Sequence, residues 1–379
     1  MARKKEEPQI NPKGVIPMES MLYGNYIQWD RMYHLTAQSF SYSNADSINV
    51  YIDMGSMISP LYHRYEEFNI QNYSVVTSSI INLCAHIRSY FESRHRVTTK
   101  IFIVYSPNCH SYNRNMYYGY NDKSYGIMHN NKVIRDMITA NLGMLNVLCQ
   151  YLYDIYFIST NWESSVVMYD IMLQEQAKGN KNPSVIFTKD QYVYQIPALM
   201  TQVAIYRPKK GERNPETGGV TDISWAVTHN SVLQKYVSED RKIDSTKCDG
   251  LDPSLLSLLM TLSNCPSRGI KSIFNISTAL KLLKQMVSEY QIQNGHSLMV
   301  GNVFDYLYES GKLKADTGSL SRQLFINRFN SIDILAQHHA YYASPDKIVN
   351  YEINLYDPES VQAINNTHFK DCPLDLNRL

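Results

Sequence analysis

Three acidic residues stand where this sequence could place metal-binding or catalytic carboxylates. Asp53 ends the apolar run at 48–52, Glu163 opens a helical stretch, and Asp190 follows the apolar run at 183–187. Hard divalent cations such as Mg²⁺ prefer oxygen ligands, and an ion held by several carboxylates can activate water and stabilise a leaving oxygen. We predict that these three residues gather into one acidic site.

The surrounding pattern predicts the elements that would position these acids. Apolar runs alternate with helical periodicities, which is typical of an α/β fold with a mainly parallel sheet flanked by helices. Because ligands bind at the carboxyl ends of parallel strands, Asp53, Ser106 and Asp190 would lie at one edge of the sheet, with Glu163 at the start of a helix beside it. Strands are predicted at 48–53, 100–105, 155–159, 184–188 and 203–207, and helices at 74–94, 132–153 and 163–176.

The later part of the chain predicts a second, smaller helical domain. Residues 207–219 are polar and contain Gly and Pro, as in an exposed loop or a hairpin tip. A helix is expected to begin at 252–253, followed by the turn-rich residues 264–269 and a second helix led by Ser277 or Thr278. The predicted organisation is an N-terminal extension at 1–44, an α/β domain at 45–225, a helical region at 226–339 and a C-terminal extension at 340–379.

The composition is that of a folded protein with balanced charge. The 379 residues include 36 Lys and Arg against 35 Asp and Glu, so bulk charge neither requires nor excludes a nucleic-acid partner, and any basic face must be local. The six cysteines are far apart, the N-terminus has no apolar signal region, and no apolar run is long enough for a membrane span. We expect a cytoplasmic protein, in the cytoplasm of the host cell if a phage encodes it. The 30 tyrosines and many asparagines are reminiscent of the AT-rich genomes of large phages.

Several stretches between residues 48 and 335 carry a resemblance to a known family. They are, in chain order, 50–56 (VYIDMGS), 101–106 (IFIVYS), 112–121 (YNRNMYYGYN), 162–166 (WESSV), 188–190 (TKD), 268–283 (RGIKSIFNISTALKLL) and 327–335 (NRFNSIDIL). In this order they resemble the 5′-nuclease family, which comprises flap endonucleases and phage or bacterial 5′–3′ exonucleases. The resemblance implies a PIN-like α/β domain followed by a helix-three-turn-helix module.

The resemblance also implies carboxylates that this chain lacks. Where the family has acids, the chain has Ser106, Ser165 or Val166, and Thr188, and residues 260–264 contain no acid. Hydrolysis in the family's manner uses two divalent ions, which several carboxylates must hold. We therefore expect one weakly bound Mg²⁺ or Mn²⁺ at most, and weak or absent hydrolysis. The residual catalytic and metal-binding residues would be Asp53, Glu163 and Asp190.

DNA contacts are a further implication of the resemblance. The segment 112–121 would form an arch or gateway over the active site, where tyrosines can stack on an unpaired base. In the helical module, Gly269 permits a tight turn near a phosphate, and Asn275, which tolerates a left-handed conformation, replaces a second glycine. The partner would be DNA with a 5′ end, a flap or a junction. The predicted nucleic-acid-binding residues are Arg114, Tyr117, Tyr120, Arg268, Gly269, Lys271, Asn275 and Lys281.

Three functions stay open at this point. The first is a DNA-binding relative of the family with weak or lost hydrolysis, and the second is an active Mg²⁺- or Mn²⁺-dependent 5′–3′ exonuclease or flap endonuclease. The third is a structural or protein-interaction role, in which the terminal extensions would contact a protein partner. Each acid also has an ordinary alternative: Asp53 and Asp190 as turn or cap residues, and Glu163 as a residue favoured at a helix start. His338 and His339 lack other ligands at suitable spacing and are expected on the surface or in the core.

Overall fold

The structure is a computed structural model. It describes residues 45–55, 74–106, 143–149, 152, 154–188, 190–207, 212–213, 220–221, 225–238, 243–265, 268–290, 300–313 and 321–348. The predicted gateway residues Arg114, Tyr117 and Tyr120 lie outside these ranges, as do the extension at 1–44 and residues 349–379.

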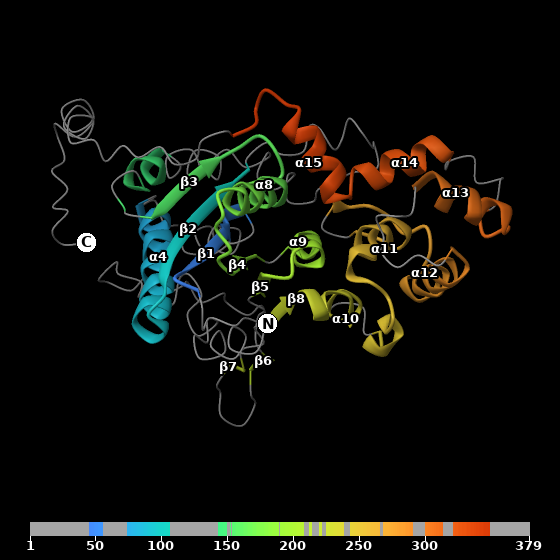
Figure 1. The fold of residues 1–379 in the computed structure, drawn as a ribbon, viewed down its shortest axis with the longest axis horizontal. Coiled ribbons are helices and arrows are strands. Elements are labelled where there is room, and N and C mark those ends of the chain that lie inside the picture. Colours follow the sequence, from blue (N-terminus) through green and yellow to red (C-terminus); the bar gives the residue numbers. More distant parts are fainter. Residues whose placement is uncertain are drawn as a thin grey trace, which may run out of the picture.

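A six-stranded sheet forms the centre of the first half of the chain (Figure 1). Its strands lie in the order β3-β2-β1-β4-β5-β8, and every neighbouring pair is parallel except β5 and β8. The mainly parallel α/β sheet predicted from the alternating pattern is therefore confirmed. The strands are β1 (Ser47–Asp53), β2 (Thr98–Tyr105), β3 (Ile155–Ser159), β4 (Ser184–Phe187), β5 (Val203–Arg207) and β8 (Trp225–Thr228).

Helices cover both faces of the sheet, and its central strands are therefore buried on both sides. β1 and β2 are nearly continuous apolar runs with almost no exposed side chain, as expected for parallel strands packed on both sides. In Figure 1, α4 and α8 lie on opposite sides of these strands. The helices are α4 (Ser74–His95), α8 (Ser164–Ala177), α9 (Gln195–Leu199), α10 (Val232–Ser238), α11 (Leu256–Leu262), α12 (Ile276–Tyr290), α13 (Val300–Glu309), α14 (Arg322–Asn330) and α15 (Ile334–Tyr342), and the 3₁₀ turns are η3 (Gln191–Tyr194), η4 (His229–Ser231), η5 (Ser245–Cys248) and η6 (Pro253–Leu255).

The strand order reverses at β1. After β1 the chain adds β2 and β3 on one side, and it then returns to add β4 and β5 on the other. In open α/β sheets such a reversal leaves a crevice at the carboxyl ends of the two strands that flank it. Those strands are β1, which ends in Asp53, and β4, which is followed by Thr188. The topology thus places the predicted acidic site where ligands usually bind.

Two antiparallel pairings follow β5 in the chain, one within the six-stranded sheet and one in a separate two-stranded sheet. The pattern did not predict β8, which pairs antiparallel with β5 and crosses the predicted boundary between residues 225 and 226. The first residues of the predicted helical region therefore belong to the sheet. The short strands β6 (Glu212–Arg213) and β7 (Val220–Thr221) pair antiparallel, which confirms the hairpin alternative for the polar segment at 207–219.

Helices α10 to α15 form the second half of the structure, and α15 returns to pack on α8 (Figure 1). His338 Nε2 lies 2.8 Å from Asp170 Oδ1, so this histidine binds a carboxylate of α8. Gln174 Nε2 of α8 donates to the carbonyl oxygen of Ile348 at 3.0 Å. The predicted boundary at residue 339 therefore falls inside a helix that is attached to the α/β half. Among the helices of the described ranges, none is both long and apolar enough to cross a bilayer.

Candidate acidic site and nucleic-acid interface

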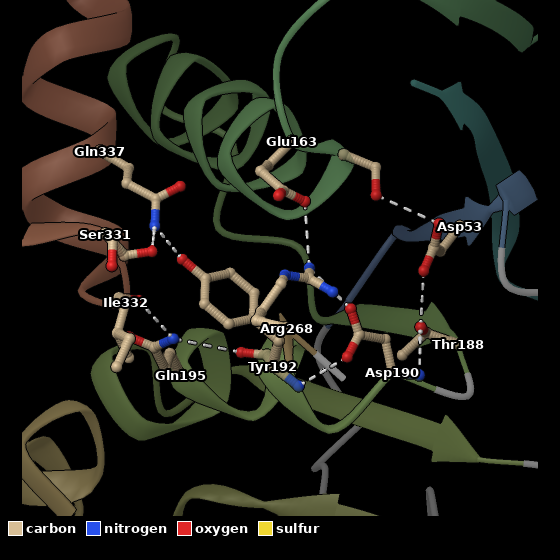
Figure 2. A network of polar contacts seen from close by, with 11 residues as sticks. Asp53, Glu163, Thr188, Asp190, Tyr192, Gln195, Arg268, Ser331, Ile332 and Gln337 are labelled. Atoms are coloured by element: carbon tan, nitrogen blue, oxygen red, sulfur yellow. Dashed lines mark hydrogen bonds and ion pairs between the residues drawn. The ribbon is translucent and has the colours of Figure 1, made fainter. Parts of the chain in front are cut away.

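The three predicted acids belong to one network of polar contacts, shown in Figure 2. Asp53 ends β1, Glu163 directly precedes α8, and Asp190 caps the 3₁₀ turn η3 after β4. Two residues connect them: Thr188, at the end of β4, and Arg268, which lies between α11 and α12. The sequence argument that strand ends would bring these acids to one edge agrees with this geometry.

The carboxylate of Asp53 is engaged by hydroxyl groups. Its Oδ2 accepts a hydrogen bond from Thr188 Oγ1 at 2.8 Å, and its Oδ1 accepts one from Ser164 Oγ at 3.1 Å. Asp53 is only 5% exposed. A buried carboxylate needs such donors because burial removes its hydration. Thr188 thus supplies a neutral donor at the position where the family resemblance implies another acid.

Glu163 and Asp190 share one cation, the guanidinium of Arg268. Arg268 Nη2 lies 3.0 Å from Glu163 Oε2 and 2.8 Å from Asp190 Oδ2. Both arginine and glutamate are almost fully buried, and the Asp190 side chain is 13% exposed. Arg268 Cζ also lies 4.4 Å above the ring centroid of Tyr192, a cation–π arrangement. The guanidinium is therefore held by two carboxylates and an aromatic face.

The ring below Arg268 is buried and neutral. Burial raises the pKa of the Tyr192 hydroxyl well above its ordinary value; the negative charge of Glu163 adds to this rise and the positive charge of Arg268 opposes it. Gln337 Nε2 of α15 donates to the Tyr192 hydroxyl and to the carbonyl oxygen of Ser331. These contacts extend the network from the acidic site to the connection between α14 and α15.

Gln195 adds a second link between the same two regions. Its Nε2 donates to the carbonyl oxygen of Ile332 at 3.0 Å, and its Oε1 accepts from the backbone N–H of Ile334 at 3.0 Å. Sequence reasoning missed Ser164, Tyr192, Gln195 and Gln337 as members of the site. Tyr192, Gln195 and Gln337 are buried in the structure, and no spacing or motif in the sequence pointed to them.

This arrangement does not fit a divalent ion between Glu163 and Asp190. A positively charged guanidinium already contacts both carboxylates, and a cation would have to displace it. Over the ranges that the structure describes, no three His, Cys, Asp or Glu side chains are grouped as metal ligands. The three acids of the predicted one-ion site thus belong to one network, but the arginine contacts Glu163 and Asp190, whereas Asp53 accepts from the hydroxyls of Thr188 and Ser164.

Two serines occupy further positions where the resemblance implies acids. Ser106 follows β2, and Ser165 lies in the first turn of α8. The Oγ atoms of both are buried and have no hydrogen-bond partner within the described part of the chain. A carboxylate at the fully buried Ser165 would add an uncompensated negative charge to the interior. The serines are compatible with a site in which one guanidinium is the cation that contacts the acids.

The helices α11 and α12 and the chain between them form a compact helix–turn–helix segment. The backbone N–H groups of Ile273 and Phe274 donate to the carbonyl oxygen of Leu262, the last residue of α11. Gly269 has a positive φ of 65°, which glycine adopts without strain. The backbone of Asn275 does not adopt the left-handed conformation that asparagine tolerates. Its side-chain Oδ1 instead accepts a hydrogen bond from the backbone N–H of Thr278 at 2.9 Å and caps α12.

A second buried arginine holds the same segment from its other side. Arg328 of α14 is 3% exposed, and its Nε donates to the carbonyl oxygen of Thr261 at 2.8 Å. Its Nη2 donates to the carbonyl oxygen of Lys271. The connection between α11 and α12 is therefore fixed by Arg268 on the α/β side and by Arg328 on the helical side.

The predicted DNA-binding residues of this segment divide into two groups. Lys271, Asn275 and Lys281 are exposed and Gly269 is partly exposed, so all four are accessible to a ligand. Arg268 is 6% exposed and binds carboxylates within the protein, which is not the phosphate-facing position expected of it. Its positive charge in a turn gave the sequence-level signal for phosphate binding, and tertiary contacts redirect it inward.

A basic groove lies along α12. It has a volume of about 530 Å³, and three lysines line it: Lys247 from η5, and Lys281 and Lys284 from α12. Glu289 is the acid among the lining residues, so the groove has a positive balance. The remaining lining residues are Ser277, Leu280, Gln285 and Ser288. Sequence reasoning included Lys281 but missed Lys247, which joins the groove only through the packing of η5 beside α12.

Comparison with known proteins gives a distant likeness in structure alone. No family model matches the sequence, and no curated protein matches it. The D15 protein of bacteriophage T5, crystallised with metal ions, is 12% identical, with a TM-score of 0.47 over 77% of this chain and 91% of its own. A variant D15 flap endonuclease of the same phage, in a pseudo-enzyme–product complex with DNA and metal ions, is 10% identical, with a TM-score of 0.45 over 77% and 90%. At this level the likeness assigns neither an activity nor a ligand to the present chain.

Proposed function

We propose that this protein is a nucleic-acid-binding relative of the structure-specific 5′-nucleases, with weak or lost phosphodiester hydrolysis. Its ligand would be DNA with a 5′ end, a flap or a junction. The observation that carries the proposal is the Arg268 guanidinium between Glu163 and Asp190, because it occupies the space between two acids that hydrolysis would need as metal ligands and offsets part of their negative charge.

The electrostatics oppose a two-ion site in this arrangement. Two like unit charges 4 Å apart repel by about 4 kcal/mol at an effective dielectric constant of 20, and a divalent ion doubles that repulsion. The resemblance implies acids at Ser106, at Ser165 or Val166, and at Thr188, and their absence weakens the attraction that could offset this repulsion. Tight binding of two Mg²⁺ ions beside Arg268 is therefore unfavourable.

Binding of a nucleic-acid phosphate has different requirements from hydrolysis, and the helix–turn–helix segment can provide them. A phosphate is favoured by backbone N–H groups at a helix start and by nearby cations, and it needs no carboxylate. The exposed Lys271 and Lys281 flank the start of α12, and Gly269 lets the preceding turn come close to a ligand. The groove of Lys247, Lys281 and Lys284 continues this positive surface along the helix. The resulting affinity would be independent of base sequence and sensitive to salt.

The test compares binding and cleavage of one labelled 5′-flap duplex. Binding is measured by fluorescence anisotropy over a salt series, once in EDTA and once in Mg²⁺, and cleavage is followed in Mg²⁺ and then Mn²⁺. We expect salt-dependent binding that is equal with and without the metal, and no cleavage. Cleavage that Asp53→Ala abolishes would establish an active enzyme, and neither cleavage nor binding would leave a protein-interaction role.

A matched pair of variants locates the binding surface. The double variant Lys281→Gln with Lys284→Gln should bind more weakly and reduce the slope of log K against log salt by about 2, since each phosphate contact contributes about 0.9. Lys181→Gln with Lys312→Gln removes the same charge from exposed positions outside the groove and should bind like the wild type. Equal losses in the two double variants would refute the groove as the binding surface.

A further inference from the structure

The cation of the acidic site is part of the protein itself. The fold has the carboxylates, the strand ends and the topological reversal at which a metal-dependent enzyme would hold an ion, yet Arg268 makes the contacts that an ion would make. We infer that Arg268 is the resident counter-cation of this site, which replaces a divalent ion and fastens the helix–turn–helix segment to the sheet. The inference is independent of whether the protein binds nucleic acid.

The geometry of the contact supports a replacement of the ion. A single nitrogen, Nη2, reaches oxygens of both Glu163 and Asp190 within 3.0 Å, so the two carboxylates converge on one positive centre (Figure 2). Without that centre, two negative groups would face each other no more than two hydrogen-bond lengths apart. Like charges at that separation in a buried site are strongly unfavourable. A cation between the two carboxylates relieves this repulsion, and Arg268 provides it.

The environment of the guanidinium is built to keep it in place. The ring of Tyr192 lies beneath it, and the backbone N–H of Tyr192 donates to Asp190 Oδ1 at 2.9 Å, which orients that carboxylate. The backbone N–H of Asp190 donates in turn to Thr188 Oγ1 at 3.0 Å, and Thr188 donates to Asp53. Arginine suits this position because its planar, permanently charged head can bind carboxylates and stack on an aromatic ring together.

The same contact joins two distant parts of the chain. Arg268 and Glu163 are 105 positions apart, the first between α11 and α12 and the second before α8. The isolated bridge between Cys265 and Ile270 and the left-handed Gly269 fix the backbone on both sides of the arginine. The acidic site thus acts as an anchor for the connection between α11 and α12, and no metal is needed for that attachment.

The experiment asks whether loss of Arg268 creates a requirement for a cation. Thermal unfolding of the full-length wild type and of Arg268→Gln is measured in EDTA and in MnCl₂, without nucleic acid, and Mn²⁺ binding is followed by the loss of the free-ion EPR signal. We expect the melting temperature of the wild type to be the same in both buffers. Arg268→Gln should melt lower in EDTA and regain part of the difference in Mn²⁺, because hard carboxylate oxygens are then available to the ion.

Two control variants make the result specific. Arg328→Gln removes the other buried arginine of the segment, whose Nε and Nη2 donate to the carbonyl oxygens of Thr261 and Lys271, so it should be destabilised without any response to Mn²⁺. Adding Glu163→Gln and Asp190→Asn to Arg268→Gln should abolish the response. Equal Mn²⁺ responses in Arg268→Gln and Arg328→Gln would overturn the inference.

If Arg268→Gln does not fold, the response of the wild-type melting temperature to Mn²⁺ still tests the inference. Wild-type protein that Mn²⁺ stabilises, with the effect lost in Glu163→Gln, would mean that the acids bind metal beside Arg268, and the inference would be wrong. Absence of stabilisation by Mn²⁺ in both the wild type and Glu163→Gln would support it. Neither readout depends on DNA binding or cleavage, so a failure here is distinguishable from a failure of the proposed function.

Discussion

Replacement of Thr188 by valine tests the hydroxyl that links two of the acids. Thr188 is fully buried; its Oγ1 donates to Asp53 Oδ2 at 2.8 Å and accepts from the backbone N–H of Asp190 at 3.0 Å. Valine has almost the same shape, so Thr188→Val removes both hydrogen bonds without opening a cavity. The change isolates the polar contribution of this one group.

The expected loss of stability can be worked from these two contacts. A hydrogen bond to a charged group contributes about 1.5–3 kcal/mol, and a buried N–H that loses its acceptor costs about 1 kcal/mol or more. We expect Thr188→Val to lower the free energy of unfolding by about 3 kcal/mol. Thr188→Ser keeps the hydroxyl and loses one methyl group, so it should cost about 1 kcal/mol.

Urea unfolding followed by intrinsic fluorescence measures both variants against the wild type. The midpoints should shift while the m-values stay the same, since the surface exposed on unfolding does not change. A difference between the valine and serine variants of less than about 0.5 kcal/mol, within the usual range of harmless substitutions, would refute the reasoning. It would mean that the hydrogen bond from Thr188 does not stabilise the buried Asp53 carboxylate. This result would count against a site that is held together without a metal ion.

Three further outcomes follow from the same structure. Arg328→Met removes donors to two carbonyl oxygens and should cost about 2–4 kcal/mol in urea unfolding, whereas Arg322→Met, which loses an exposed ion pair, should cost about 1 kcal/mol or less. Gly269→Ala imposes a side chain at a φ of 65° and should lower stability by about 1–2 kcal/mol, measured in the same way. Burial raises the pKa of the Cys248 thiol from 9.0 to about 11, so the native state holds this proton more tightly than the unfolded state does. Its contribution to stability is complete below pH 9 and is lost as the pH rises towards 11; Cys248→Ala should therefore flatten the alkaline decline of the melting temperature.

The sequence predicted the frame of this fold because its signals are local. Continuous apolar runs such as 48–52 and 101–105 are buried on both faces, and that burial depends on composition more than on any particular partner. Alternation with helical stretches then implies parallel strands, whose carboxyl ends must share one edge. This was enough to bring Asp53, Glu163 and Asp190 together in the prediction. The edge strand β8 was missed, since four residues after an irregular segment carry too little pattern.

Sequence alone determined which acids are present, which positions hold Ser or Thr instead, and which strands deliver them. Only the tertiary structure decided which positively charged side chain contacts Glu163 and Asp190. An arginine beside a glycine in a turn has the same local signature whether it faces a phosphate or a carboxylate. Its direction is set by residues 78 and 105 positions away, Asp190 and Glu163, together with the ring of Tyr192. A buried charge takes the partner that the packed chain places within reach, and that partner is fixed only when the connection between α11 and α12 packs against the residues before α8 and after β4.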